Sequence, residues 1–157
     1  MDEPFELRFE KPTGVFVCRA SGLIVRDKKF LAVAHVDLPG YFYTVGGAVN
    51  LHETSDAAVV REVYEEVGVW LEIERLAFVN EEFFLLDGKK FHQVTFYYLM
   101  KAEPYLDIAE GDPTDQEGET LHWLPVDSLG NYNLVPRFLR SWSLDNAAVE
   151  HIISEEY

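Results

Sequence analysis

Three glutamates lie close together in the chain, at positions 62, 65 and 66. On an ideal α-helix, where each residue advances by about 100°, Glu62, Glu65 and Glu66 fall within an arc of roughly 100°. Clustered carboxylates disfavour one another's ionised forms, and no Lys or Arg lies between Glu62 and Gly68 to offset them. A hard divalent cation such as Mg²⁺, which prefers oxygen ligands, would relieve this repulsion. Because an acidic run on a helix is usually a solvated face, the metal-site interpretation depends on the wider spacing of the segment.

Apolar residues around the glutamates predict the helix that carries them. Four valines recur at helical spacing and face about 120° away from the carboxylates. They are Val59, Val60, Val63 and Val67. Thr54 or Ser55 is a suitable N-cap, and Gly68 stands where a helix C-cap is common. The helix can therefore bury its valine side and hold the three carboxylates together on another side.

The remaining pattern is dominated by strands. The expected strands are two within Gly14–Val36 (with residues 26–29 as the turn), then Trp70–Leu86, Lys89–Ala102 and Leu121–Leu124. Asp87-Gly88 is a strong hairpin dipeptide between the two long strands. Acidic residues crowd the polar loop Glu103–Gly118, and the chain from Val135 through Trp142 is expected to be helical. For Ala147–Ile153 the sequence allows either a helix or a closing strand. This order predicts an α+β fold or a mixed α/β/α sandwich rather than alternating βαβ units.

Composition restricts the ligand and the compartment. The 157 residues fit a single domain, residues 1–157, with one core. With 28 acids against 13 bases, the net charge of -15 disfavours binding of duplex nucleic acid, but a divalent cation can still bridge the protein to a small phosphorylated ligand. Cys18 is the single cysteine, which excludes an internal disulfide, and its apolar neighbours favour a core position. The sequence has no secretory signal and no apolar run long enough to span a membrane, so we expect a cytoplasmic protein.

The spacing around the glutamates resembles the signature of the Nudix hydrolases, Gly-x5-Glu-x7-Arg-Glu-u-x-Glu-Glu-x-Gly-u, where u is a bulky aliphatic residue. The matching residues are Gly47, Glu53, Arg61, Glu62, Val63, Glu65, Glu66, Gly68 and Val69. Thr44-Val45 replaces the Leu-Pro that many relatives carry before the paired glycines, and residues 50–52 replace a common Glu-x-Gly. The resemblance implies the Nudix fold, a mixed β-sheet in an α/β/α sandwich with a loop-helix-loop motif.

The resemblance also implies a role for each residue of the motif. Glu65 and Glu66 would be the principal Mg²⁺ ligands, with Mn²⁺ as a substitute. Glu62 would be a further ligand or the base that activates water. Arg61 and Glu53 would pair and fix the helix against the preceding loop.

Two glycines and one later carboxylate complete the implied site. Gly47 would let the chain turn tightly, and Gly68 would end the helix in a conformation that Gly adopts cheaply. Relatives often place a further carboxylate on a later strand or loop, for which Glu119 is the first candidate and Glu117 the second. The candidate catalytic residues are Glu53, Arg61, Glu62 and Glu119.

The implied reaction is Mg²⁺-dependent hydrolysis of the pyrophosphate bond in a nucleoside diphosphate linked to another group. A nucleoside di- or triphosphate is the default substrate, although the sequence does not identify the attached group. Aromatic residues at 41–43 or 83–84 are candidates for stacking a base, and His92 and Gln93 are expected near the cleft, without an assigned role. The alternatives are a non-catalytic nucleotide-sensing module of the same fold, a plain acidic cation-binding protein and a diphosphate isomerase. A homodimer is also open.

Overall fold

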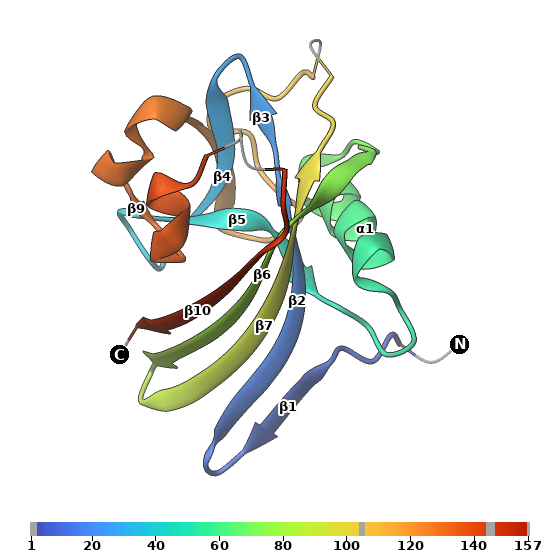
Figure 1. Ribbon diagram of the computed structural model, residues 1–157, viewed down its shortest axis with the longest axis vertical. Helices are drawn as coiled ribbons and strands as arrows, with labels where there is room; N and C mark the ends of the chain where they lie inside the picture. Colours follow the sequence, from blue (N-terminus) through green and yellow to red (C-terminus); the bar gives the residue numbers. More distant parts are fainter. Residues whose placement is uncertain (1–2, 104–105, 144–146, 157) are drawn as a thin grey trace.

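A mixed β-sheet forms the centre of the computed structural model, which describes residues 3–103, 106–143 and 147–156 (Figure 1). The strands are β1 (Arg8–Lys11), β2 (Gly14–Leu23), β3 (Val25–Arg26), β4 (Lys29–His35), β5 (Tyr41–Ala48), β6 (Ile73–Leu86), β7 (Lys89–Met100), β8 (Glu119–Pro125), β9 (Asn133–Leu134) and β10 (Glu150–Glu156). The helical segments are α1 (Ser55–Val67) and the 3₁₀ helices η1 (Val126–Asn131) and η2 (Arg137–Ser141).

The sheet runs in the order β10-β6-β7-β2-β5-β4-β3, with β1, β8 and β9 attached to β2, β4 and β5. The strand β2 is parallel to β7 on one side and antiparallel to β5 on the other. On its second edge β6 pairs with β10 in parallel. Mixed pairing around one main helix confirms the predicted α+β class.

Helix α1 covers one face of the sheet because its valine side is apolar. Val59 and Val63 are fully buried against Ala20 and Val45 from the strands beneath. The approach is close, because a Cβ at Gly22 would lie 2.9 Å from a methyl carbon of Val63. This contact fixes the height of the helix above β2, and with it the positions of the glutamates.

The opposite face is covered by η1 and η2 (Figure 1). Leu129 of η1 and Leu139 of η2 are buried against Phe30 and Tyr97 of the sheet. The expected helix from Val135 through Trp142 is therefore shorter and of the 3₁₀ type. The backbone is extended at both of its ends, at Pro136 and Trp142, and a short 3₁₀ turn is a common connector between such segments.

Two other expectations concern strands. The hairpin at Asp87-Gly88 is confirmed, since both residues adopt the positive φ angles of 50° and 76° that a tight hairpin turn demands. Residues 147–153, which the sequence left undecided between a helix and a closing strand, contain the start of β10. The residues of β10 alternate between exposed and half-buried. No helix in the described ranges has the length and apolar composition needed to cross a membrane.

Candidate active site

The ends of α1 are set by local interactions. Thr54 is the N-cap, and its hydroxyl accepts a hydrogen bond of 3.4 Å from the backbone N–H of Ala57. At the other end, Gly68 has φ 83° and donates its N–H to the carbonyl of Tyr64 at 2.8 Å. Because a left-handed residue at this position favours glycine, the predicted end of the helix is confirmed.

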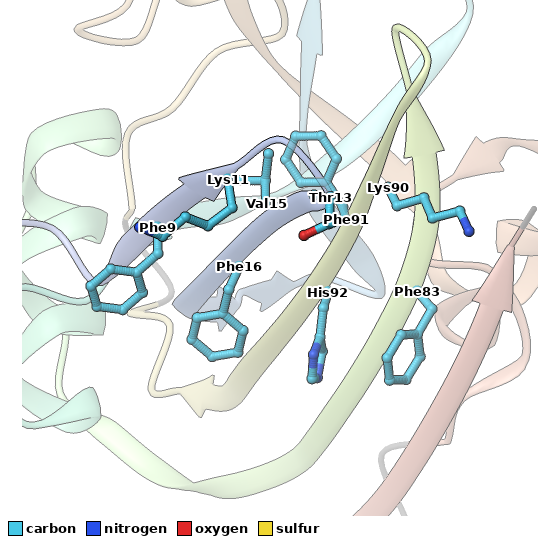
Figure 2. Close-up of a pocket in the computed structure, with 10 residues that line it drawn as sticks. Phe9, Lys11, Thr13, Val15, Phe16, Phe83, Lys90, Phe91 and His92 are labelled. Carbon is cyan, nitrogen blue, oxygen red and sulfur yellow. The ribbon is translucent and has the colours of Figure 1, made fainter.

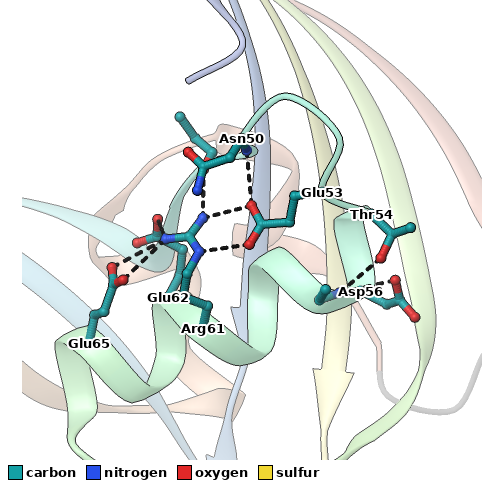
Figure 3. Close-up of polar contacts among 9 residues, drawn as sticks. Asn50, Glu53, Thr54, Asp56, Arg61, Glu62 and Glu65 are labelled. Carbon is teal, nitrogen blue, oxygen red and sulfur yellow. Dashed lines mark hydrogen bonds and ion pairs between the residues drawn. The ribbon is translucent and has the colours of Figure 1, made fainter. Parts of the chain in front are cut away.

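Arg61 ties α1 to the loop that precedes it (Figure 3). Its Nε donates to Glu53 Oε1 at 2.7 Å and its Nη2 to Glu53 Oε2 at 2.9 Å. The backbone N–H of Asn50 also donates to Glu53, and Nη2 of Arg61 reaches the carbonyl of Ala48. The hydrogen bonds from Arg61 hold the pKa of Glu53 below its ordinary value. The expected pairing of Arg61 with Glu53 is present and bidentate, a geometry that fixes both side chains.

The same guanidinium contacts two of the three clustered glutamates. Nη1 of Arg61 donates to Glu62 at 2.7 Å and to Glu65 at 3.3 Å. The side chain of Glu62 is 13% exposed, whereas that of Glu65 is 41% exposed. Burial raises the pKa of Glu62, and the hydrogen bond from Arg61 opposes the rise. Arg61 therefore orders these carboxylates without neutralising the whole cluster.

Gly47 lies inside β5, so the expected tight turn at this residue is wrong. Its small size serves a different purpose, because a Cβ at position 47 would overlap the carboxylate of Glu62. The absence of a side chain lets Glu62 lie directly against the backbone of β5. Close approach of another group, rather than backbone freedom, is the reason for glycine here.

Glu66 is the carboxylate in the least favourable surroundings. It accepts one hydrogen bond of 3.3 Å, from the backbone N–H of Gly46, and forms no salt bridge within the described residues. Burial raises the pKa of Glu66 to about 9, with further contributions from the negative charges of Glu119 and Glu62. The opposing charge of Arg19 does not offset them. At neutral pH Glu66 therefore holds a proton unless another cation approaches.

Glu119 joins the cluster from β8, although it is 53 residues away from Glu66 in the sequence. Its Oε1 accepts a hydrogen bond of 3.0 Å from the hydroxyl of Thr114. Glu117, the second candidate, is exposed and does not line the cavity beside the cluster. The fold thus brings Glu119, and not Glu117, to the helix glutamates.

A cavity of about 580 Å³ opens over these side chains and is called the glutamate cavity below. Its lining residues are Glu3, Pro4, Glu6, Gly46, Gly47, Ala48, Asn50, Arg61, Glu62, Glu65, Glu66, Asp115, Gln116 and Glu119. Across the parts of the chain that are described, no three acidic, His or Cys side chains already converge in a metal-binding arrangement. Within this cavity, Glu62 and Glu65 are held by hydrogen bonds to Arg61.

Sequence reasoning missed Arg19 and the residues of the 115–116 loop. Arg19 is opposite Ala48 in the pairing of β2 with β5, and its charge lowers the pKa of both Glu62 and Glu66. Asp115 and Gln116 line the glutamate cavity from the loop before β8. No local sequence signal marks these residues, since their positions depend on strand pairing.

The aromatic candidates for base stacking lie elsewhere. None of the residues 41–43 or 83–84 lines the glutamate cavity. His92, expected near the cleft, lines a different cavity together with Phe83, while Gln93 is buried and donates to Glu82 at 3.2 Å. Successive residues of β7 point to opposite faces of the sheet, so the two side chains are separated. The expected proximity of His92 and Gln93 to the cleft is not found.

Known proteins resemble this chain in sequence and in structure. The NUDIX domain matches residues 16–143. A MutT-like protein from Streptomyces ambofaciens is 39% identical over 57 residues, so the match covers 36% of this chain and 36% of that protein. The crystal structure of a MutT NUDIX hydrolase from Burkholderia pseudomallei has a TM-score of 0.56 at 28% identity and covers 71% of this chain and 84% of its own. An ADP-ribose pyrophosphatase from Streptococcus suis has a TM-score of 0.55 at 16% identity, covering 87% and 98%, which shows likeness of fold.

Proposed function

This chain belongs to the Nudix family, and from that membership we propose that it is a divalent-metal-dependent pyrophosphohydrolase. The substrate class is a nucleoside diphosphate linked to another group, with a nucleoside di- or triphosphate as the first candidate. The observation that carries the proposal is that three motif glutamates, Glu62, Glu65 and Glu66, line one cavity together with Glu119. Among them, Glu66 is half-buried and is repelled by the negative charges of Glu119 and Glu62.

The donor set fits a divalent cation chemically. Glu66 is a hard oxygen donor whose pKa rises because of burial and negative neighbours, and a cation beside it would favour its ionised form. Mg²⁺ commonly uses one or two carboxylates and completes its shell with water and phosphate oxygens. A preformed cage of three carboxylates is therefore not needed. Glu65 is the more exposed of the two clustered glutamates that contact Arg61, and it would leave Arg61 to reach the ion.

Individual residues of the chain would then have separate roles in the reaction. When bound, the cation supplies charge that neutralises the diphosphate and makes a water molecule more acidic. Glu62 or Glu119 accepts the proton of the attacking water, because both carboxylates line the glutamate cavity. Arg61 and Glu53 hold α1 at a fixed distance from β5, so that the carboxylates keep their positions during the reaction. Attack on phosphorus breaks the pyrophosphate bond, and the leaving phosphate takes the bonding electrons.

The experiment is release of phosphate or pyrophosphate from nucleoside di- and triphosphates, ADP-ribose and dinucleoside polyphosphates, with Mg²⁺ or Mn²⁺. Glu65→Gln and Glu66→Gln test the ligands, and Glu119→Gln tests the later carboxylate. Glu117→Gln is the matched control, because this exposed residue lies two positions from Glu119 and outside the cavity.

We expect metal-dependent turnover that falls at least about 100-fold in the Glu65 and Glu66 variants and is unchanged in the Glu117 variant. No turnover by a folded protein that binds Mg²⁺ and a nucleotide would instead support a nucleotide-sensing module.

A further inference from the structure

A row of four aromatic rings crosses the sheet away from the glutamate cavity (Figure 2). The aromatic row consists of Phe9 on β1, Phe16 on β2, His92 on β7 and Phe83 on β6. The residues are direct cross-strand partners, Phe9 with Phe16, Phe16 with His92, and His92 with Phe83. Cross-strand partners share one face of a sheet, and Figure 2 shows all four rings pointing the same way.

The rings contact one another in sequence along the row. Ring centroids are 6.3 Å apart for Phe9 and Phe16, 5.2 Å for Phe16 and His92, and 4.5 Å for Phe83 and His92. The first and last of these pairs are stacked. Phe9 is nevertheless 48% exposed, and His92 is also exposed. An exposed and contiguous aromatic surface of this kind is more typical of a binding site than of a core.

A cavity of about 280 Å³ lies along the row, and none of the acidic residues that the structure describes lines it. Lys11 and Lys90 line it with the rings. Each lies two positions along its strand from a ring, Lys11 from Phe9 and Lys90 from His92, and therefore on the same face of the sheet. Neither lysine forms an ion pair within the described residues, unlike the neighbouring Lys89, which pairs with Glu10.

The charged side chains that line this cavity are positive, whereas the net charge of the chain is negative. The protein carries 28 acids against 13 bases, yet the rings here are bordered by two ammonium groups that have no ion-pair partner in the described part of the chain. Glu155 of β10 is in register with Phe83 and marks the acidic border at that end of the row. No residue is shared with the lining of the glutamate cavity, so the row is a separate site.

We propose that the aromatic row binds a mononucleotide, with its base stacked on the rings and its phosphate beside Lys11 and Lys90. Aromatic faces stack on any nucleobase, and ammonium groups bind phosphate as point charges. A neutral apolar ligand would leave both lysines without a role. The net charge of -15 disfavours a long polynucleotide at the same surface. This site is independent of the proposed hydrolysis.

The test uses AMP as the probe, because AMP has no pyrophosphate bond to cleave, in EDTA so that the glutamate cavity lacks a divalent ion. Binding is followed by calorimetry and by amide chemical shifts of the intact protein. We expect AMP to bind more tightly than adenosine or inorganic phosphate, with shifts centred on Phe9, Phe16, Lys90 and His92. Glu66→Gln should leave this binding unchanged, which separates it from the proposed function.

Variants at exposed positions limit the risk of misfolding. Phe9→Leu and His92→Gln each remove a stacking ring and should weaken AMP binding about tenfold. Lys90→Gln should weaken it about threefold, since an exposed ion pair contributes little. Lys29→Gln, an exposed lysine on β4 outside this cavity, is the matched control and should change nothing.

Three outcomes would overturn the proposal. The first is AMP shifts confined to the residues of the glutamate cavity, and the second is no binding at millimolar AMP. The third is a dimer in ultracentrifugation that the Phe9 and His92 variants reduce to a monomer without any AMP binding, which would assign the row to a second copy of the chain.

Discussion

The glutamate cavity and the aromatic row are lined by different residues, and they are organised by different forces. In the cavity, carboxylates of like charge are held together by the helix backbone, by Arg61 and by the close fit of Glu62 against Gly47. In the row, rings stack across neighbouring strands without any such repulsion. A site assembled against repulsion needs a cation to complete it, whereas one assembled by stacking is complete without one.

Removal of the metal should give the largest difference between the two sites. With EDTA in excess, we expect hydrolysis to fall at least about 100-fold because the carboxylates of the cavity lose the charge that offsets them. AMP binding at the aromatic row should change less than about twofold, since no carboxylate of residues 3–103, 106–143 or 147–156 lines that cavity. Parallel activity and calorimetric measurements on one preparation test both. Equal loss of the two would mean that they are a single site.

Gly47→Ala should separate packing from charge in the glutamate cavity. The added Cβ displaces the Glu62 carboxylate, so we expect hydrolysis to fall about 10- to 100-fold. The free energy of unfolding should change little, because the displaced atoms are the end of a flexible side chain. Kinetics and urea unfolding measure the two effects. Gly130→Ala is the control, because its nearest neighbour would be 3.9 Å from the new Cβ. Unchanged kinetics in the Gly47 variant would contradict the close-fit explanation.

Glu82 offers a buried carboxylate that belongs to neither site. It lies next to Phe83 on β6 but on the opposite face of the sheet, where Gln93 donates to it. Burial raises the pKa of Glu82 to about 7, and the charge of Glu156 adds to the rise. Because the folded state keeps this proton to a higher pH than the unfolded state, the stabilisation is complete below about pH 4.5 and is lost as the pH rises through about 7.

Glu82→Gln should therefore flatten the fall of Tm between about pH 5 and pH 7.5, since glutamine does not ionise. Thermal unfolding across this range, in EDTA, measures the slope. Glu74→Gln, an exposed residue on the same strand, should retain the wild-type slope. A Glu82 variant with the same slope as wild type would show that another group dominates the titration.

The smallest expected effect is that of salt on the aromatic row. Raising NaCl from about 0.05 to 0.5 M should weaken AMP binding by only about two- to threefold, because Lys11 and Lys90 contribute through screened, exposed charges. Adenosine, which lacks the phosphate, should bind equally at both concentrations. A salt-dependent adenosine affinity would argue against a purely stacking role for the rings.

The sequence by itself determined the helix and most of the motif it carries. The caps at Thr54 and Gly68, the hairpin at Asp87-Gly88 and the valine side of α1 depend on neighbours within a few residues. The pairing of Arg61 with Glu53 was also implied, although by the resemblance to a family signature and not by local physics. In each of these features, the interacting residues are close to one another in the sequence.

Only the tertiary structure decided which distant groups share a site. Glu119 reaches Glu66 through the pairing of β8 with β4, and Arg19 reaches the same cluster through β2 and β5. The close fit behind Gly47 and the assembly of the aromatic row likewise depend on which strands are neighbours and in what register. The physical reason is that a shift of one residue in register turns every side chain of a strand to the other face, and that register is set by packing across the whole sheet.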